Sequence, residues 1–136
     1  MITALDTNVL LDILAPDAEF CDVSARALER VADEGSLVIC VVVYAELCAH
    51  FRTQRQCDEF IEENDIRLEP LDRATCFLAS RTWRSYRAQG GKRTRILPDF
   101  LIGAHAQLQA SRLLSRDRGF YREMFPSLRL IDPSID

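Results

Sequence analysis

The sequence lacks the features of membrane and secreted proteins. None of its apolar runs approaches the length that spans a bilayer, and no basic leader precedes an apolar core near the N-terminus. These absences predict a cytoplasmic protein. The 136 residues, 48% hydrophobic and 28% charged, suffice for one globular domain with its own core. No repeat or low-complexity tract divides the chain, so we expect a single domain over residues 1–136.

Paired cysteines are also missing. The five cysteines form no C-x-x-C pair and have no histidine at ligand spacing: Cys21, Cys40, Cys48, Cys57 and Cys76. Their odd number and scatter disfavour both a zinc site and a disulfide framework. We expect buried, reduced thiols instead. The two histidines, His50 and His105, each stand alone on a helical pattern and are interpreted as structural.

Lysine is almost absent, and the positive charge, mostly arginine, is unevenly distributed. The net charge is −4, yet residues 81–122 hold ten basic residues against two acids, a local balance of +8. The remainder of the chain carries −12. Such asymmetry within one domain favours a face that meets an anionic polymer. The simpler alternative is an arginine-rich helix surface that only faces solvent.

Apolar periodicity and turn residues predict five strands separated by helices. The expected strands are 1–5, 37–43, 66–71, 112–115 and 128–131. The expected helices are 9–14, 19–33, one from 44 past 51, 54–63, 72–87, 97–110 and 120–124. The run 37–43 is β-branched and does not alternate, as is typical of a strand buried on both faces of a parallel sheet. The pattern therefore predicts a three-layer α/β/α fold with a central, mainly parallel sheet.

Four acidic residues stand out by their position relative to these elements. Asp6, Glu46 and Asp117 come just after the first, second and fourth expected strands, and Asp99 opens the helix that leads into the fourth. Ligands of open α/β sheets collect at the carboxyl ends of the strands, so we expect these acids at one edge. Asp6 and a neighbour, Asn8, could instead serve only as helix caps.

Carboxylates that converge repel one another, and therefore either have raised pKa values or bind a hard cation. Mg²⁺ or Mn²⁺ suits an all-carboxylate set that lacks histidine and thiolate. This arrangement points to metal-assisted hydrolysis of a phosphodiester. The adjacent basic residues could then hold a nucleic acid backbone. The candidates for this contact are Lys92, Arg93, Arg95 and Arg116.

Four segments resemble, in order and spacing, the motifs of PIN-domain nucleases, most closely the VapC toxins of toxin–antitoxin pairs. They are Leu5-Asp6-Thr7-Asn8, Val43-Tyr44-Ala45-Glu46-Leu47, Pro98-Asp99-Phe100-Leu101-Ile102-Gly103-Ala104 and Leu114-Ser115-Arg116-Asp117-Arg118-Gly119-Phe120. The resemblance covers essentially the whole chain.

The resemblance implies that Asp6, Glu46, Asp99 and Asp117 form a metal-binding quartet. It implies that Asn8 and Ser115 orient these acids or the attacking water, with Ser115 at a position often held by threonine. It further implies an endoribonuclease, usually a homodimer, that is inhibited by a small VapB-like antitoxin.

Two other classes of protein compete with this interpretation. A PIN fold without catalytic activity could act as a binding scaffold, although all four acids are present. A phosphoacceptor receiver domain would need adjacent acids after the first strand and a lysine after the last. Asp6 is followed by Thr7, and the only lysine is Lys92, so the receiver domain is disfavoured.

Overall fold

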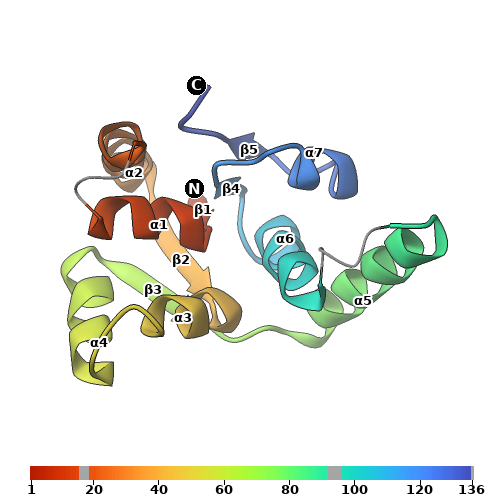
Figure 1. Ribbon diagram of the computed structural model, residues 1–136, viewed down its shortest axis with the longest axis horizontal. Coiled ribbons are helices and arrows are strands. Elements are labelled where there is room, and N and C mark those ends of the chain that lie inside the picture. The colour runs from red at the N-terminus through yellow and green to blue at the C-terminus, as the bar shows by residue number, and fades with distance from the viewer. Residues whose placement is uncertain (16–18, 92–95, 136) are drawn as a thin grey trace.

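The structure is a computed structural model that describes residues 1–15, 19–91 and 96–135 (Figure 1). Its strands are β1 (Ile2–Leu5), β2 (Ser36–Cys40), β3 (Ile66–Glu69), β4 (Arg112–Leu114) and β5 (Leu130–Ile131). Its helices are α1 (Thr7–Leu14), α2 (Cys21–Glu34), α3 (Val41–Cys48), α4 (Gln54–Glu63), α5 (Arg73–Ala88), α6 (Leu97–Gln109) and α7 (Phe120–Met124).

The strands form one sheet in the order β3-β2-β1-β4-β5, and every neighbouring pair is parallel. The crossovers from β1 to β2 and from β2 to β3 run in the same direction across the sheet, and parallel crossovers of one hand place α1 to α4 on one face. The chain then returns past β1, so that α5, α6 and α7 cover the other face, as Figure 1 shows. The predicted three-layer α/β/α fold is confirmed.

The direction of the connections reverses between β1 and β4. Leu5 pairs with Leu114 across these two strands, so the residues that follow them, Asp6 and Ser115, emerge side by side. In open α/β sheets the crevice outside such a switch point is the usual place for a ligand. The topology therefore brings two of the sequence motifs together before any side chain is considered.

The core consists of two apolar layers, one on each face of the sheet. Val9, Leu10 and Leu47 are fully buried on the side of α1 and α3. On the other side the buried ring of Phe100 lies 5.1 Å from that of Phe120, edge to face, between ring centroids. These two layers fix the helices that carry the candidate acids.

The prediction was wrong about the end of the second strand. The β-branched run was expected to stay extended to Val43, but β2 ends at Cys40 and Val41–Val43 form the first turn of α3. Helix α3 also ends at Cys48, short of Phe51. Glu46 consequently lies within a helix, more than a turn beyond the strand. The other elements agree with the prediction apart from shifts at their ends.

The predicted burial of the thiols is confirmed for two of the five; Cys21 and Cys48 are half-buried, and His50 is exposed. All five cysteines are free; Cys40 and Cys57 are buried, but Cys76 is exposed. His105 is buried, and its Nε2 lies 2.9 Å from Glu69 Oε1, which supports a structural role. Within the described ranges, no helix has the length and apolarity needed to cross a membrane.

Candidate active site

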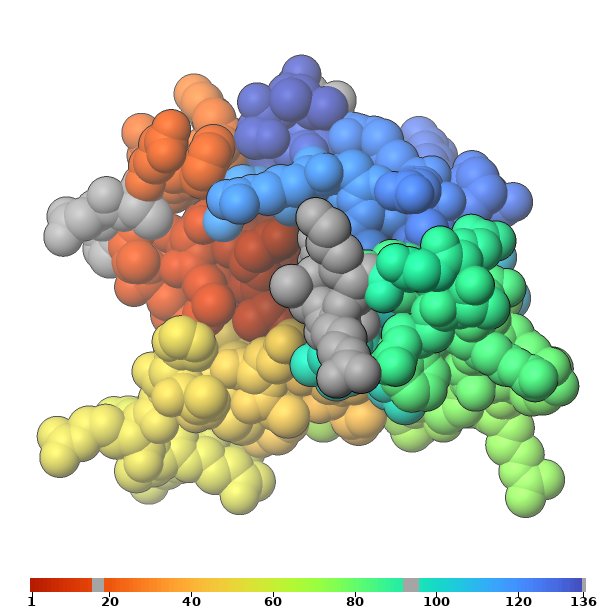
Figure 2. All heavy atoms as spheres, turned by 45° about the vertical axis from the view of Figure 1, so that its right-hand side comes forward, coloured from red at the N-terminus to blue at the C-terminus, as the bar shows by residue number. Residues whose placement is uncertain are grey.

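A cavity of about 470 Å³ opens at the carboxyl edge of the sheet, beside the switch between β1 and β4. Residues from both ends of the chain line it, and the space-filling view shows why this is possible. The N-terminal segment lies between α3 and α4 on one side and the C-terminal third on the other (Figure 2). All four predicted acids are in the lining: Asp6, Glu46, Asp99 and Asp117.

Asp6 is the most buried of the four, with only 7% of its surface exposed. It is the N-cap of α1, because its Oδ1 accepts a hydrogen bond from the Thr7 backbone N–H at 2.7 Å. Its Oδ2 accepts from the hydroxyls of Ser115 at 2.7 Å and Tyr121 at 2.9 Å. The carboxylate is therefore held from three sides and points to the cavity edge.

Glu46 reaches the same cavity from α3 and is exposed. Its Oε1 accepts a hydrogen bond from the Thr7 hydroxyl at 2.6 Å. Thr7 thus contacts two acids, through its backbone to Asp6 and through its side chain to Glu46. This contact compensates for the distance of Glu46 from the end of β2.

Asp99 lies on the opposite face of the sheet, in the first turn of α6. Its Oδ2 accepts a hydrogen bond from the Ile96 backbone N–H at 3.3 Å, which satisfies one of the free donors of the helix start. Pro98 at the beginning of the helix has no N–H to lose. The sequence Leu97-Pro98-Asp99 therefore sets both the helix start and the direction of this acid.

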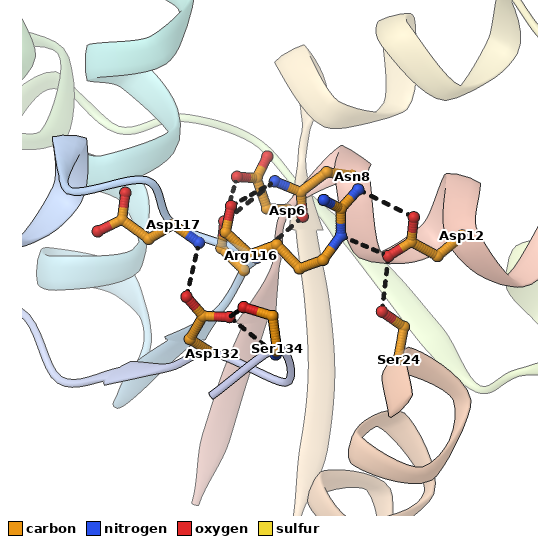
Figure 3. A network of polar contacts seen from close by, with 9 residues as sticks. Asp6, Asn8, Asp12, Ser24, Arg116, Asp117, Asp132 and Ser134 are labelled. Carbon is orange, nitrogen blue, oxygen red and sulfur yellow. Dashed lines mark hydrogen bonds and ion pairs between the residues drawn. The ribbon is translucent and has the colours of Figure 1, made fainter. Parts of the chain in front are cut away.

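Asp117 follows β4 and is half-buried. Its two carboxylate oxygens accept from the backbone N–H groups of Tyr121 and Arg122, each at 3.1 Å. Its own N–H donates to Oδ2 of Asp132 at 3.1 Å, as Figure 3 shows. Asp132 follows β5, is only 1% exposed, and anchors this candidate acid.

Asn8 and Ser115 connect α1 with the segment after β4. Asn8 Oδ1 accepts from the Arg116 N–H at 3.1 Å, and its Nδ2 donates to the Arg116 carbonyl at 3.2 Å and to Ser115 Oγ at 3.3 Å. The expectation that Asn8 caps the helix was wrong, because Asp6 occupies that position. Its position instead agrees with a residue that orients the acids.

The cavity concentrates negative charge. Burial raises the pKa of Asp6, and the charge of Asp99 raises it further, against the three hydrogen bonds that lower it. Burial together with the charges of Asp6, Asp99 and Asp117 raises the pKa of Tyr121 well above its usual value, so its hydroxyl stays a donor. None of the four acids forms an ion pair with any residue in the described ranges.

The four carboxylates are chemically suited to a hard divalent cation, but the described side chains do not all meet at one position. Four carboxylates line the cavity, and a cation would offset their charge. Within residues 1–15, 19–91 and 96–135, however, no three Asp, Glu, His or Cys side chains approach closely enough to hold a metal together. Mg²⁺ keeps several waters and needs only one or two protein carboxylates. The chemistry of the residues therefore fits Mg²⁺ or Mn²⁺ held partly through water.

The predicted RNA contacts lie in different places. Lys92, Arg93 and Arg95 fall outside the described residues. Arg116 lines the cavity, but its guanidinium binds Asp12 through Nε at 2.7 Å and Nη2 at 2.9 Å. Arg118, also in the lining, is exposed.

Sequence reasoning missed four residues that hold the site: Thr7, Asp12, Tyr121 and Asp132. Tyr121 and Asp6 are 115 positions apart, and no local pattern links them. Only Thr7, next to Asp6 within a recognised motif, carried a signal that could have been used.

Comparison with known proteins agrees with the class that this geometry defines. The PIN domain family matches residues 3–123, and the chain belongs to that family. A search of curated proteins gave no match.

Solved structures share the fold over nearly the whole chain. The structure of VapBC2 from Rickettsia felis bound to a promoter DNA fragment gives a TM-score of 0.74 at 21% identity, covering 97% of this chain and 98% of that one. VapBC-1 from nontypeable Haemophilus influenzae gives 0.72 at 21% identity, covering 98% and 99%. FitAcB from Neisseria gonorrhoeae gives 0.69 at 19% identity, covering 98% and 99%.

Proposed function

We propose that this PIN-domain protein is a divalent-metal-dependent endoribonuclease and the toxin of a toxin–antitoxin pair. PIN domains of the VapC type are nucleases, which hydrolyse phosphodiester bonds. The observation that carries the proposal is the convergence of Asp6, Glu46, Asp99 and Asp117, from four separate segments, on one cavity at the switch point of the sheet.

In this proposal the four acids hold Mg²⁺ or Mn²⁺ jointly and partly through water, because no three of the described side chains approach closely enough to bind it directly. Such an ion supplies a Lewis acid that activates water and offsets the charge developing on the phosphate. The hydroxyls of Ser115 and Tyr121 keep the Asp6 carboxylate in one orientation, and the Thr7 hydroxyl does the same for Glu46.

The polar groups beside the acids complete the proposed site. Asn8 fixes Ser115 and the backbone of residue 116, and thereby the segment that carries Asp117 into the cavity lining. Arg118, and in sequence Lys92, Arg93 and Arg95, are proposed to contact RNA phosphates near the acids. A preformed arrangement of this kind orients substrate and ion without reorganisation during the reaction.

The decisive experiment is cleavage of labelled RNA by the purified protein with Mn²⁺, with Mg²⁺ and with EDTA. We expect cleavage only with metal. Asp99→Asn keeps the shape of the site and removes one charge, and should lower the rate at least about a hundredfold, since a Lewis-acid contribution of several kcal/mol is at stake. Asp33→Asn, an exposed acid on α2, is the matched control and should cleave normally.

Equal cleavage in EDTA, or by the Asp99 variant, would contradict the proposal. RNA that binds but stays intact with either metal would favour the catalytically inactive scaffold.

The neighbouring structures suggest the partners. They are described as VapBC or FitAB assemblies or as a toxin–antitoxin complex, some of them on DNA. We propose a VapB-like antitoxin, a homodimer and a cytoplasmic location for this chain. Light scattering on the purified protein, whose chain mass is 15.5 kDa, tests the dimer directly: a mass of one chain at micromolar concentration would contradict it.

A further inference from the structure

A largely buried ion pair lies beside the candidate active site, and the resemblance to the four motifs assigns it no role. Asp12, on α1, is 5% exposed. Its Oδ2 accepts from Nε of Arg116 and from Oγ of Ser24, each at 2.7 Å, and its Oδ1 accepts from Arg116 Nη2 at 2.9 Å. The pair is therefore a two-pronged carboxylate–guanidinium contact with a third donor on the carboxylate, the strong kind of ion pair.

Arg116 also makes contacts beyond its ion pair with Asp12. The carbon at the centre of its guanidinium lies 4.4 Å from the centroid of the Phe20 ring. Asn8, one turn before Asp12 on the same helix, binds both the N–H and the carbonyl of residue 116. Helix α1 thus binds the backbone of Arg116 through Asn8 and its side chain through Asp12. Figure 3 shows these two contacts one helical turn apart.

Arg116 lies in the chain between Ser115 and Asp117, two residues of the candidate site. On one side Ser115 donates to Asp6, and on the other Asp117 donates its N–H to Asp132. Figure 3 shows Asp12 and Asp132 on opposite sides of this short segment. Fixing Arg116 therefore fixes the position from which both neighbours meet the cavity.

The ion pair also decides where a positive charge lies. Arg116 belongs to the cavity lining, but with Asp12 bound its guanidinium points away from Asp6 and Asp117 (Figure 3). Without the Asp12 charge, the carboxylates of the cavity would be the strongest remaining attraction for the guanidinium. An arginine bound there would compete with a divalent cation.

We propose that Asp12 is a positioning residue of the nuclease site, acting through Arg116. It anchors the Ser115–Asp117 segment to α1, and it keeps the guanidinium out of the space that the metal needs. The proposal rests on the proposed function. A merely structural ion pair would affect stability but would not alter the metal requirement.

The test is a double-mutant cycle on the full-length protein, with RNA cleavage measured over a range of Mn²⁺ concentrations. Asp12→Asn should lower kcat about tenfold, by loss of a charged hydrogen bond, and raise the Mn²⁺ concentration for half-maximal rate by a similar factor. Arg116→Met keeps the stem against Phe20 and should lower kcat while leaving the metal requirement unchanged. The double variant should behave like Arg116→Met.

Ser24→Ala is the matched control, because it removes a hydrogen bond from the same carboxylate without touching Arg116. It should lower the melting temperature slightly and leave both kinetic quantities near wild type. If Asp12→Asn does not fold, Arg116→Lys carries the same prediction, since an ammonium cannot bind Asp12 with two nitrogens.

The proposal is overturned if Asp12→Asn, or Arg116→Lys in its place, has the wild-type metal requirement, or if the Asp12 effect persists undiminished in the Arg116→Met background. The shift of the melting temperature by Mn²⁺ is measured in parallel and does not depend on cleavage. A wild-type protein that binds Mn²⁺ but never cleaves RNA would refute the proposed function. In that case the cycle of melting shifts still decides the role of Asp12: a reduced shift in Asp12→Asn supports it, and an unchanged shift overturns it.

Discussion

At the scale of single residues, the site depends on how a buried carboxylate is stabilised. Asp6 has three hydrogen-bond donors but no ion pair with a described residue, and its pKa is raised. Burial and the charge of Asp99 outweigh the hydrogen bonds. The residue therefore costs the protein stability when it is ionised without metal, a feature often found at functional sites.

The unfavourable ionisation of Asp6 predicts an unusual pH dependence of the free energy of unfolding. A carboxyl group with a raised folded pKa contributes stability that is fully present below its unfolded value of 3.8 and is lost as pH rises through the folded pKa. In EDTA, Asp6→Asn should therefore gain free energy of unfolding relative to wild type as the pH rises from 4 to 8. Urea denaturation across this range measures the difference.

Asp72 supplies a control of the opposite sign. Hydrogen bonds from Thr75 lower the pKa of this N-cap, so its stabilising contribution is lost as pH falls through the folded pKa. Because this contribution is almost fully present above the unfolded value of 3.8, the difference between Asp72→Asn and wild type should stay nearly constant from pH 4 to 8 and shrink only below pH 4. Curves of the same slope for both variants would contradict the assigned environment of Asp6.

At the scale of helices and strands, the sequence predicted the existence of the elements better than their limits. The seven residues Leu37–Val43 all suit a strand, yet three of them begin α3. No capping side chain marks this boundary, because Cys40 precedes the helix without a side-chain hydrogen bond. Packing against the sheet overrides local propensity here.

The candidate acids could be predicted from the sequence, but the residues that hold them in place could not. Asp6, Asp99 and Asp117 each adjoin the end of a strand or the start of a helix, which a periodicity analysis locates. Asp12 and Arg116 are 104 positions apart, and their contact exists only after the sheet has formed. Partners of this kind cannot be read from spacing in a single sequence.

One close contact between elements gives a prediction on helix α6. Gly103 faces Phe125, and a methyl group added at Gly103 would lie 2.3 Å from the Phe125 ring. Alanine normally stabilises a helix by up to about 1 kcal/mol over glycine. Because the ring is buried beside Phe100, we expect Gly103→Ala instead to destabilise by about 1–3 kcal/mol.

Urea denaturation in EDTA measures this effect, with Leu108→Ala as the control. Leu108 lies on the same helix and is 49% exposed, so its truncation should cost little. A Gly103→Ala protein as stable as wild type would mean that the ring of Phe125 moves freely.

At the scale of the whole molecule, part of the basic charge of residues 81–122 is paired with acids and does not face solvent freely. Arg112, within the basic region, is buried beside Thr3 and paired with Glu34. Arg116 is neutralised by Asp12. The four acids of the cavity have no such partner among the described residues, so a cation bound there should have a large effect on stability.

Metal should therefore stabilise the protein. A ligand that binds only the folded state contributes about 2.7 kcal/mol at a hundredfold excess over Kd, which is roughly 10 °C in melting temperature for a domain of this size. Mn²⁺ should raise the melting temperature of wild type and of Asp33→Asn, and much less that of Asp117→Asn. Identical melting of wild type in Mn²⁺ and in EDTA would count against a metal site.

Arg118 is the arginine of the cavity lining that remains available to RNA, because it is exposed while Arg116 is bound to Asp12. Each phosphate contact with a single strand releases counterions and contributes about 0.7 to the slope of log affinity against log salt. In an Asp99→Asn background, which prevents cleavage, Arg118→Ala should weaken RNA binding and reduce this slope by about 0.7. Binding isotherms at several salt concentrations measure both quantities.

Arg55→Ala is the matched control for this measurement. Arg55 is equally charged, its side chain is 88% exposed, and it lies on α4 in an ion pair with Glu59. Its removal should leave the slope unchanged, because that helix end is not part of the cavity lining. If Arg118→Ala also leaves slope and affinity unchanged, the backbone of the RNA is held elsewhere. Replacing Lys92, Arg93 and Arg95 together by alanine then tests the alternative. A fall of about two units in the salt slope of this triple variant would place the contact on that segment.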